Sequence, residues 1–444
     1  MIDGLIKSVG KKGTKWSNWA GNVECVAEHI FYPRTEHEIV EIVHLANTEK
    51  KRIRVVGEGH SFSGLVATDH FIISLEYMTG IIEVDKQKLV ATAWAGTSIN
   101  KANTALFKSG LAMINLGDID VQSLGGATAT GTHGTGTSFG NVSTEITAFT
   151  IITAKGEILN CSKDQNTDVF MAGRVSLGAL GIITKMTFNV VEAYKLEYSS
   201  SSNDFYKTLE TLEDYNEKNR NFEFYYFPHS NKLQIKESNR TDKPVKNNKI
   251  LAYINDVFLE NTVMNIVSRI GITFPSTAKA LSRWMAKAVP KGTTIDYSHE
   301  IYATVRTVYF KEMEYNIPIE HFKACIQEFK DLLEKSEYFV FFPVECRFVK
   351  GDDIWLSPAY GRDSAYIAIH VFINQEHDPY FKDMEALFMR YNGRPHWGKM
   401  HTRTADTLST TYEKWADFLA LRAKLDPHKL FLNPHLEAVF GLQD

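Results

Sequence analysis

The hydrophobic pattern in the first third of the chain predicts short strands that alternate with helices. Apolar residues recur with helical spacing between Ile39 and Ala46, and Thr35 with Glu38 forms a capping box in front of them. Ser98 is expected to cap a second, shorter helix that runs through Leu106. Runs with β-type patterning occupy residues 52–56, 71–75, 81–84, 89–94, 148–153 and 157–160. The last two runs flank a short glycine-containing turn and predict a hairpin.

The pattern changes near residue 196, where longer amphipathic segments begin to mix with aromatic runs. Residues 222–227 and 338–342 are rich in Phe and Tyr and are expected to form strands. Residues 415–425 have helical spacing and end at Asp426-Pro427, a typical helix stop. We therefore place a domain boundary near residue 196.

Composition and charge narrow the class of protein. A chain of 444 residues is long enough for two or three domains of about 150 residues each. Hydrophobic residues make up 44% and charged residues 23%, which is typical of a globular protein. The net charge is −4, without the basic excess of a nucleic-acid-binding protein, so no nucleic-acid partner is expected.

The sequence shows no apolar run of about 18 residues, and its first residues lack the apolar core of a signal peptide. A structural zinc site would require closely spaced cysteines, but the four cysteines show no CxxC spacing. No HExxH motif occurs either. We therefore expect a soluble, cytoplasmic protein without an integral membrane segment and without a metal site.

Two glycine-rich loops, 57–64 and 125–136, suggest backbone N–H groups that are presented to a phosphate or pyrophosphate. Neither loop has the spacing of a dinucleotide fingerprint, and neither is followed by a Walker lysine. Each loop alone is equally compatible with a tight turn between strands. A protein that only carries a nucleotide is therefore one alternative to an enzyme.

A hydrolase is a second alternative, because Gly136-Thr137-Ser138-Phe139-Gly140 satisfies the GxSxG pattern of a nucleophile elbow. An elbow needs a hydrophobic strand immediately before it and a helix immediately after it. The residues before this motif are Thr, Gly and His rather than a hydrophobic strand, so its context disfavours the hydrolase.

The later half supplies candidate chemical groups. Glu345 and Arg347 are two residues apart in an apolar run, so on a strand they share a face and are expected to be partly buried. His370 lies in a second apolar run, and Lys399 follows a Pro-His-Trp-Gly segment. Together these side chains provide acid, base and anion-stabilising groups. His60 lies within the first glycine loop, within reach of a ligand held there.

Taken in order, the motifs resemble the aldonolactone oxidase and alditol oxidase branch of the vanillyl-alcohol-oxidase flavoprotein family. The resemblance covers nearly the whole chain and is closest to the gulonolactone and arabinonolactone oxidases. It rests on Trp19-Ala20-Gly21-Asn22, Gly59-His60-Ser61-Phe62, residues 125–134, residues 176–181, Glu314-Tyr315, Val344-Glu345-Cys346-Arg347-Phe348, Trp355-Leu356-Ser357-Pro358 and Arg394-Pro395-His396-Trp397-Gly398-Lys399, with the closing Leu425-Asp426-Pro427 and Phe431-Leu432-Asn433.

The resemblance implies an α+β fold: an FAD-binding domain of two subdomains (residues 1–195), a substrate-binding cap domain with a mixed or antiparallel sheet (196–415), and a segment that returns to the FAD domain (416–444). It implies FAD as cofactor, with His60 bonded covalently to the 8α-methyl carbon of the flavin. The residues implied at the cofactor are Val55, Val56, Gly57, Glu58, Gly59, His60, Ser61, Gly117, Asp118, Ser123, Gly126, Thr130, Gly131, Thr132, His133, Ile183 and His396.

The implied reaction is hydride transfer from a carbinol carbon to the flavin, with Glu345, Arg347, Lys399 and His370 as catalytic residues. Lys399 would accept or relay the hydroxyl proton only if its pKa is depressed. By the same resemblance, Gly117 leaves room for O2 and predicts an oxidase that forms hydrogen peroxide. Asp118 and Phe372 replace a serine and a threonine of alditol oxidases. The expected substrate is therefore a sugar 1,4-lactone oxidised at C2, with a polyol as the alternative.

Overall fold

The computed structural model describes residues 10–247, 261–303 and 308–443. The first half of the chain contains a four-stranded sheet in the order β1-β2-β4-β3, in which β2 and β3 both run parallel to β4. Helix α2 packs on this sheet through Ile39, Ile42 and Val43, which contact a core that includes Phe71. The bounds are β1 Gly10–Ser17, β2 Glu24–Phe31, α2 Glu36–Glu49, β3 Ile53–Val56 and β4 Phe71–Ser74.

A five-stranded antiparallel sheet follows, in the order β5-β6-β10-β8-β9. A two-stranded ladder, β11-β7, lies next in the chain and closes this half. The bounds are β5 Ile81–Asp85, β6 Val90–Trp94, α3 Ile99–Lys108, β7 Leu111–Ala112, α4 Leu124–Ala129, η1 Val142–Glu145, β8 Ile146–Ile152, β9 Ile158–Ser162, α5 Thr167–Gly173, β10 Ile182–Asn189 and β11 Val191–Glu192.

The second half is built on an eight-stranded antiparallel sheet in the order β15-β12-β14-β13-β17-β18-β16-β19. Helices α12 and α13 cover one face of it, where Phe322 and Phe388 join a core with Phe348. The strands are β12 Lys195–Asp204, β13 Asn221–Tyr226, β14 Lys232–Arg240, β15 Gly292–Tyr297, β16 Phe310–Pro318, β17 Val344–Val349, β18 Ser364–Phe372 and β19 Arg394–Pro395. The helices are α6 Phe205–Glu210, α7 Leu212–Lys218, α9 Asn261–Thr273, η3 Pro275–Thr277, α10 Ala278–Lys287, α11 Ser298–Tyr302, α12 Ile319–Lys335 and α13 Asp378–Arg390.

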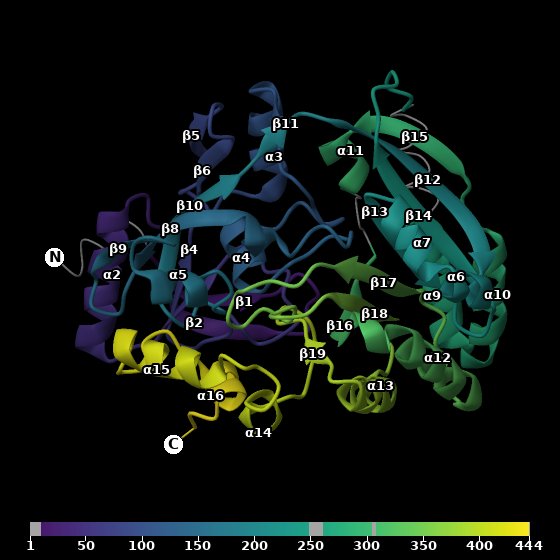
Figure 1. Ribbon diagram of the computed structural model, residues 1–444. Coiled ribbons are helices and arrows are strands. Elements are labelled where there is room, and N and C mark those ends of the chain that lie inside the picture. Colours follow the sequence, from purple (N-terminus) through teal and green to yellow (C-terminus); the bar gives the residue numbers. More distant parts are fainter. Residues whose placement is uncertain (1–9, 248–260, 304–307, 444) are drawn as a thin grey trace.

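The C-terminal helices return to the first half of the molecule, as Figure 1 shows in yellow. They are α14 Ala405–Leu408, α15 Trp415–Leu425 and α16 Pro434–Phe440. Trp415, Phe418, Leu436 and Phe440 belong to the same hydrophobic core as residues of the five-stranded sheet, such as Phe149. The division of the chain into three domains stays a prediction, although the sheet membership changes between β11 and β12.

Most predicted elements are confirmed. Helix α2 begins after Thr35, whose hydroxyl accepts the N–H of Glu38, and α15 has the predicted bounds. Ser98 precedes α3, but its side chain makes no capping bond because its hydroxyl bonds the Asn100 side chain instead. In the part of the chain that the structure describes, no helix has both the length and the apolar character that crossing a bilayer requires.

The strand predicted at 338–342 is wrong, because these residues form an irregular connection between α12 and β17. Val340 and Phe341 are both buried, without the alternation of a strand, while Phe339 is half exposed. The hydroxyl of Tyr338 bonds Asp383 instead of a strand neighbour. Aromatic composition here reflects packing against neighbouring helices and not strand pairing.

Candidate active site

A first pocket lies along the loop that follows β3. Its empty volume is about 1290 Å³, counting the part open to solvent. Other parts of the chain also contribute to its wall: Trp16, residues 74–76, residues 95–96, the segment 122–130 and the segment 176–183. The predicted cofactor residues that line it are Val55, Val56, Gly57, Glu58, Gly59, His60, Ser61, Ser123, Gly126, Thr130 and Ile183.

Backbone geometry in this pocket fits an anionic ligand. Within the described residues, the amide N–H groups of residues 58–61 donate no hydrogen bond to the protein. Gly59 has φ +69°, a conformation that glycine adopts without strain. A Cβ on Gly57 would lie 2.1 Å from the Ser123 hydroxyl, so only glycine lets the two loops approach this closely. Such a concave set of free amides is typical of a pyrophosphate site.

His60 projects from the same loop and stacks on Trp19, with ring centroids 5.6 Å apart. Burial, with a smaller contribution from the nearby Lys399 cation, lowers the pKa of His60 to about 4. At neutral pH its imidazole is therefore uncharged and has a free lone pair on one ring nitrogen.

A second pocket, of about 550 Å³ empty volume, shares Gln122 with the first. Two buried polar atoms on its wall, Gln122 Oε1 and Thr132 Oγ1, have no hydrogen-bond partner in the protein and so point to a polar ligand. The four predicted catalytic residues line this pocket, together with five residues predicted at the cofactor: Gly117, Asp118, Thr132, His133 and His396. Gly131 lines neither pocket and instead packs near Pro358 and Val175.

Strand register explains how the chain gathers these groups on one sheet face. Ala368 of β18 pairs with Glu345 of β17 on one side and with Glu314 of β16 on the other. Two residues further along β18, His370 pairs with Glu312. Because side chains two apart share a face, the three central strands present all of these groups to the second pocket.

Lys399 is held by a carboxylate. Its Nζ lies within hydrogen-bond distance, 2.5 Å, of Glu312 Oε2, and His370 Nε2 lies 3.5 Å from Glu312 Oε1. Burial alone would raise the pKa of Glu312, but Lys399 and His370 lower it to about 2. Burial alone would lower the pKa of Lys399, but the carboxylates of Glu312 and Glu314 outweigh this effect and raise the pKa above its usual value. The depressed pKa that a lysine base requires is therefore not found, and Lys399 is a cation.

Arg347 is surrounded by carboxylates. Its guanidinium lies 2.8 Å from Glu223, 2.7 Å from Glu345 and 3.4 Å from Asp118, and the Tyr225 hydroxyl bonds Glu345. Burial acts to lower the pKa of Arg347, yet these carboxylates raise it well above its usual value. The predicted burial of the Glu345 and Arg347 pair is confirmed, since both side chains are more than nine-tenths buried.

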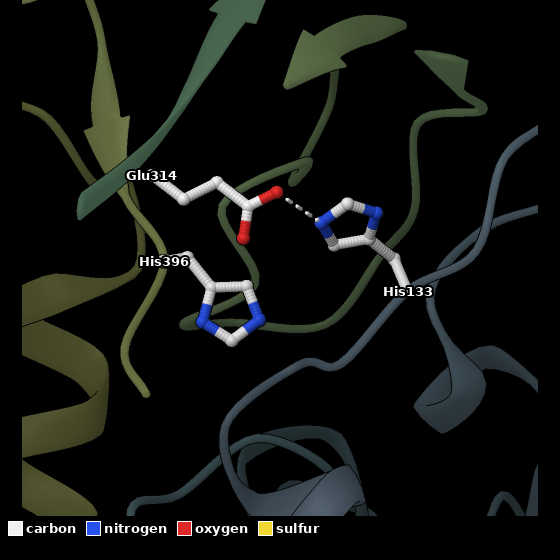
Figure 2. Close-up of side chains that lie close together, drawn as sticks. All are labelled: His133, Glu314 and His396. Atoms are coloured by element: carbon white, nitrogen blue, oxygen red, sulfur yellow. Dashed lines mark hydrogen bonds and ion pairs between the residues drawn. The ribbon is translucent and has the colours of Figure 1, made fainter. Parts of the chain in front are cut away.

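Figure 2 shows the side chains of His133, Glu314 and His396 close together, and all three line the second pocket. His133 Nε2 lies 3.1 Å from Glu314 Oε1, and its Nδ1 lies 2.9 Å from the Gly134 carbonyl. His133 and its neighbours outweigh the effect of burial and hold the pKa of Glu314 far below its usual range. Both ring nitrogens of His133 thus lie next to oxygen atoms, one of the Glu314 carboxylate and one of the Gly134 carbonyl.

Two histidines and a carboxylate within 4.8 Å of one another also match the ligand types of a metal site. However, His396 Nδ1 accepts the N–H of Gly398, which places the proton of the neutral ring on Nε2. That ring then offers no lone pair to a metal. The cluster is therefore arranged as a hydrogen-bonded pair of His133 and Glu314 beside a neutral His396.

Sequence reasoning missed several residues of the site: Glu223, Tyr225, Glu312 and Gln122, with Glu314 noted only as part of a motif. The sequence of β16 contained a pattern that could have identified Glu312 and Glu314. Glu312, Glu314 and Asn316 alternate with the core residues Met313, Tyr315 and Ile317, the same two-residue period that identified Glu345 and Arg347.

The hydrolase alternative loses its structural basis. Ser138 is exposed in a turn, no strand ends directly before it, and no helix begins immediately after it, since the short η1 starts only at Val142. It lines neither of the two pockets.

Comparison with known proteins first defines the class. Residues 27–162 match the FAD binding domain family. The fold is shared with cholesterol oxidase from B. sterolicum, with a TM-score of 0.84 and 17% identity over 97% of each chain, and with a solvent-stable cholesterol oxidase, with a TM-score of 0.82 and 18% identity over 97% of this chain and 98% of that one. The protein is thus an FAD-binding flavoprotein, and the predicted α+β architecture is confirmed.

Residues 186–439 match the D-arabinono-1,4-lactone oxidase family. The chain is 37% identical to L-gulono-1,4-lactone dehydrogenase of Mycobacterium tuberculosis, over 96% of this chain and 99% of that protein. It is 34% identical to L-gulonolactone oxidase of Bos taurus, over 97% of this chain and 99% of that protein. The chain belongs to the D-arabinono-1,4-lactone oxidase family, whose members are FAD-dependent oxidoreductases, and the resemblance predicted from the motifs is confirmed.

Proposed function

We propose that the protein oxidises a sugar 1,4-lactone at C2 in the second pocket, with FAD in the first pocket and O2 as the final electron acceptor. The observation that carries this proposal is the junction of the two pockets at Gln122, which puts a polar, charged substrate pocket beside an anion-binding loop. When bound, FAD supplies the acceptor for the hydride that leaves the carbinol carbon.

The residues of the first pocket fit FAD. Residues 58–61 offer free amide donors to the pyrophosphate, and Gln122 offers an unpartnered oxygen at the junction. We assign the covalent attachment of the flavin to His60, because its uncharged imidazole projects from the pyrophosphate loop.

The contacts in the second pocket suggest a role for each charged side chain on its wall. Lys399 and Arg347 are fixed cations, and each donates hydrogen bonds toward oxygen atoms of the substrate that gain negative charge. Glu345 orients Arg347 and accepts a hydrogen bond from a substrate hydroxyl. Lys399 is protonated, and both ring nitrogens of His370 face oxygen acceptors, the Glu312 carboxylate and the Pro343 carbonyl. We therefore assign acceptance of the C2 hydroxyl proton to the Glu345 carboxylate that bonds this hydroxyl.

A lactone suits this pocket better than an open-chain polyol. Asp118 is engaged with Arg347, and Phe372 packs in an apolar cluster with Phe310, so neither position supplies the hydroxyl contact that would hold a polyol chain. Relatives of the chain are named for gulonolactone and arabinonolactone, which agrees with this choice.

The test is the visible spectrum of the purified protein without oxygen, recorded before and after addition of an aldono-1,4-lactone. The proposal expects bleaching of the flavin by the lactone and a return of colour with hydrogen peroxide on exposure to air. Bleaching only by an alditol such as xylitol would move the assignment to a polyol oxidase. A colourless protein would overturn both assignments.

A further inference from the structure

Strand β13 lies next to β17 in the eight-stranded sheet and contacts the charged side chains of the second pocket. Every second residue of β13 belongs to the hydrophobic core, and the residues between them face the opposite side of the sheet. Among the latter, Glu223 stands directly opposite Arg347 of β17, and Tyr225 stands directly opposite Glu345. Neither Glu223 nor Tyr225 lines the pocket, but each contacts a residue that does. Strand β13 therefore acts on the site through the side chains of its neighbour.

The Glu345 carboxylate receives two donors on the same oxygen atom. The Tyr225 hydroxyl donates to Glu345 Oε1, and a guanidinium nitrogen of Arg347 lies 2.7 Å from that atom. Glu223 lies 2.8 Å from Arg347 Nε, so the guanidinium cannot turn away from Glu345 without breaking a second ion pair. The orientation of Glu345 is therefore set by two neighbours, of which Tyr225 is the uncharged one.

Tyr225 keeps its proton and acts as a donor toward Glu345. Burial raises the pKa of the Tyr225 hydroxyl well above its usual value, and the Glu223 and Glu345 carboxylates raise it further. The side chain is 8% exposed, and the Lys236 ammonium lies 4.4 Å from the centroid of the ring, which helps to hold the ring in place. A hydroxyl that donates to a carboxylate stabilises the ionised form of that carboxylate.

We propose that Tyr225 is a positioning residue for the reaction: its hydroxyl keeps Glu345 ionised and oriented so that Oε2 takes up the substrate proton. This role rests on the proposed function, in which the C2 hydroxyl gives its proton to Glu345 while C2 loses its hydride and becomes a carbonyl carbon. Two donors already bond Oε1, so the accepted proton belongs on Oε2. Tyr225 acts entirely through Glu345 and needs no contact with the substrate.

The substitution Tyr225→Phe removes this hydroxyl and no other atom. In the FAD-loaded protein without oxygen, the rate constant of flavin reduction at saturating lactone should fall about tenfold at neutral pH, because a charge-assisted hydrogen bond is lost. The lactone concentration for half-maximal reduction should change less than about twofold. The acid decline of the reduction rate should move to higher pH, because Glu345 without this donor takes up a proton more readily. Rapid mixing across about pH 5–9, with the aldono-1,4-lactone that bleaches the parent, measures these quantities.

Tyr226→Phe is the matched control. Tyr226 is the next residue of β13, is fully buried, and packs near Phe205 on the core side of the sheet. Loss of its hydroxyl should leave the reduction rate and its pH profile as in the parent.

Parental rates with an unshifted pH profile in Tyr225→Phe would overturn this role, as would equal losses in both variants or a loss confined to lactone binding. A parent whose flavin no lactone reduces would overturn the proposed function, and this role with it. The two failures are distinguishable, because the first is seen only against a parent that the lactone reduces.

Discussion

At the scale of single residues, the charge state of Lys399 is set by Glu312. The lysine is buried, and burial alone would favour its neutral form, so the neighbouring carboxylate is what keeps it an ammonium. Lys399 is therefore a permanent hydrogen-bond donor, at a position where the sequence alone was also compatible with a base. Proton acceptance must then come from a group other than Lys399.

Replacement of Lys399 by Met should slow flavin reduction by about 100-fold or more, because a charge-stabilising donor is lost at the developing negative charge. Substrate binding should weaken much less. Rapid-mixing measurements of flavin reduction without oxygen separate the two effects. Unchanged reduction kinetics would contradict the role of Lys399 as a donor.

The substitution Glu312→Gln tests the ion pair between Glu312 and Lys399. Without the carboxylate, burial lowers the pKa of Lys399, so the ammonium is lost as the pH rises and flavin reduction should develop an alkaline decline. The parent keeps Lys399 protonated and should lack this decline. Glu328→Gln, an exposed carboxylate on α12, serves as the control and should leave the pH profile unchanged.

Gly117→Ala tests the choice of electron acceptor. A Cβ at this position would lie 2.9 Å from the His133 carbonyl oxygen, so the methyl group presses on the backbone that forms this wall of the second pocket. Reoxidation of the reduced flavin by O2 should slow by about tenfold, equivalent to about 1.4 kcal/mol in the barrier. Reduction by substrate should change little. Reoxidation at the parent rate would remove Gly117 from the oxygen path.

Covalent attachment is checked by denaturing the protein in acid. The parent should retain its yellow colour in the precipitate, whereas His60→Ala should release all flavin to the supernatant. Ser61→Ala, which alters the neighbouring loop residue, should still retain it. Free flavin from the parent itself would show that the cofactor is held without a bond to His60.

At the scale of elements, Arg54 on β3 connects two loops of the first half with the C-terminal segment. Its guanidinium donates to the carbonyl groups of Leu65, Leu177, Gly178 and Phe431, and the side chain is almost fully buried. Replacement by Met leaves these carbonyls without donors and should cost about 3–5 kcal/mol of stability.

Arg52, two residues earlier on the chain, is the matched control for this prediction. It pairs with Glu437 at 2.8 Å in a partly exposed position, so Arg52→Met should cost about 1 kcal/mol or less. Thermal unfolding of both variants, followed by flavin fluorescence, makes the comparison. Equal losses would show that the buried carbonyl contacts of Arg54 contribute little.

Helices and strands with a clear hydrophobic period could be predicted from the sequence. The pairing of strands that are far apart in the chain could not. The spacing from Ile39 to Ala46 and the turn at Gly156 identify local structure directly, because each depends on nearby residues. The pairing of β18 between β16 and β17 depends on contacts far apart in the chain, so the meeting of Glu314 with His133 was not readable. The motifs that resemble the family pointed to Glu345, Arg347, His370 and Lys399, and the structure puts all four on the wall of one pocket.

At the scale of the whole molecule, buried histidines make stability depend on pH. Burial lowers the pKa of His60, His229, His401 and His435 to about 4 and that of His396 to about 3, from 6.5. Below about pH 6.5 the unfolded chain binds protons that the folded chain does not. The free energy of unfolding therefore falls as the pH drops from 6.5 toward 4.

The melting temperature measured across this pH range should decrease steadily toward acid. His401→Phe should flatten the decrease, because both ring nitrogens of His401 are buried without partners and take up a proton only on unfolding. His37→Gln alters an exposed histidine and should leave the slope unchanged. Identical slopes in all three proteins would assign the acid sensitivity to other groups.

The return of the last helices to the first half also affects how the protein is made. The core that contains Phe149 and Phe188 includes Trp415, Phe418, Leu436 and Phe440, which are synthesised after the sheet of the second half. The first half therefore lacks part of its interior until these helices have left the ribosome. We expect stable capture of the flavin to wait for them, although the loop at residues 58–61 is made near the beginning of synthesis.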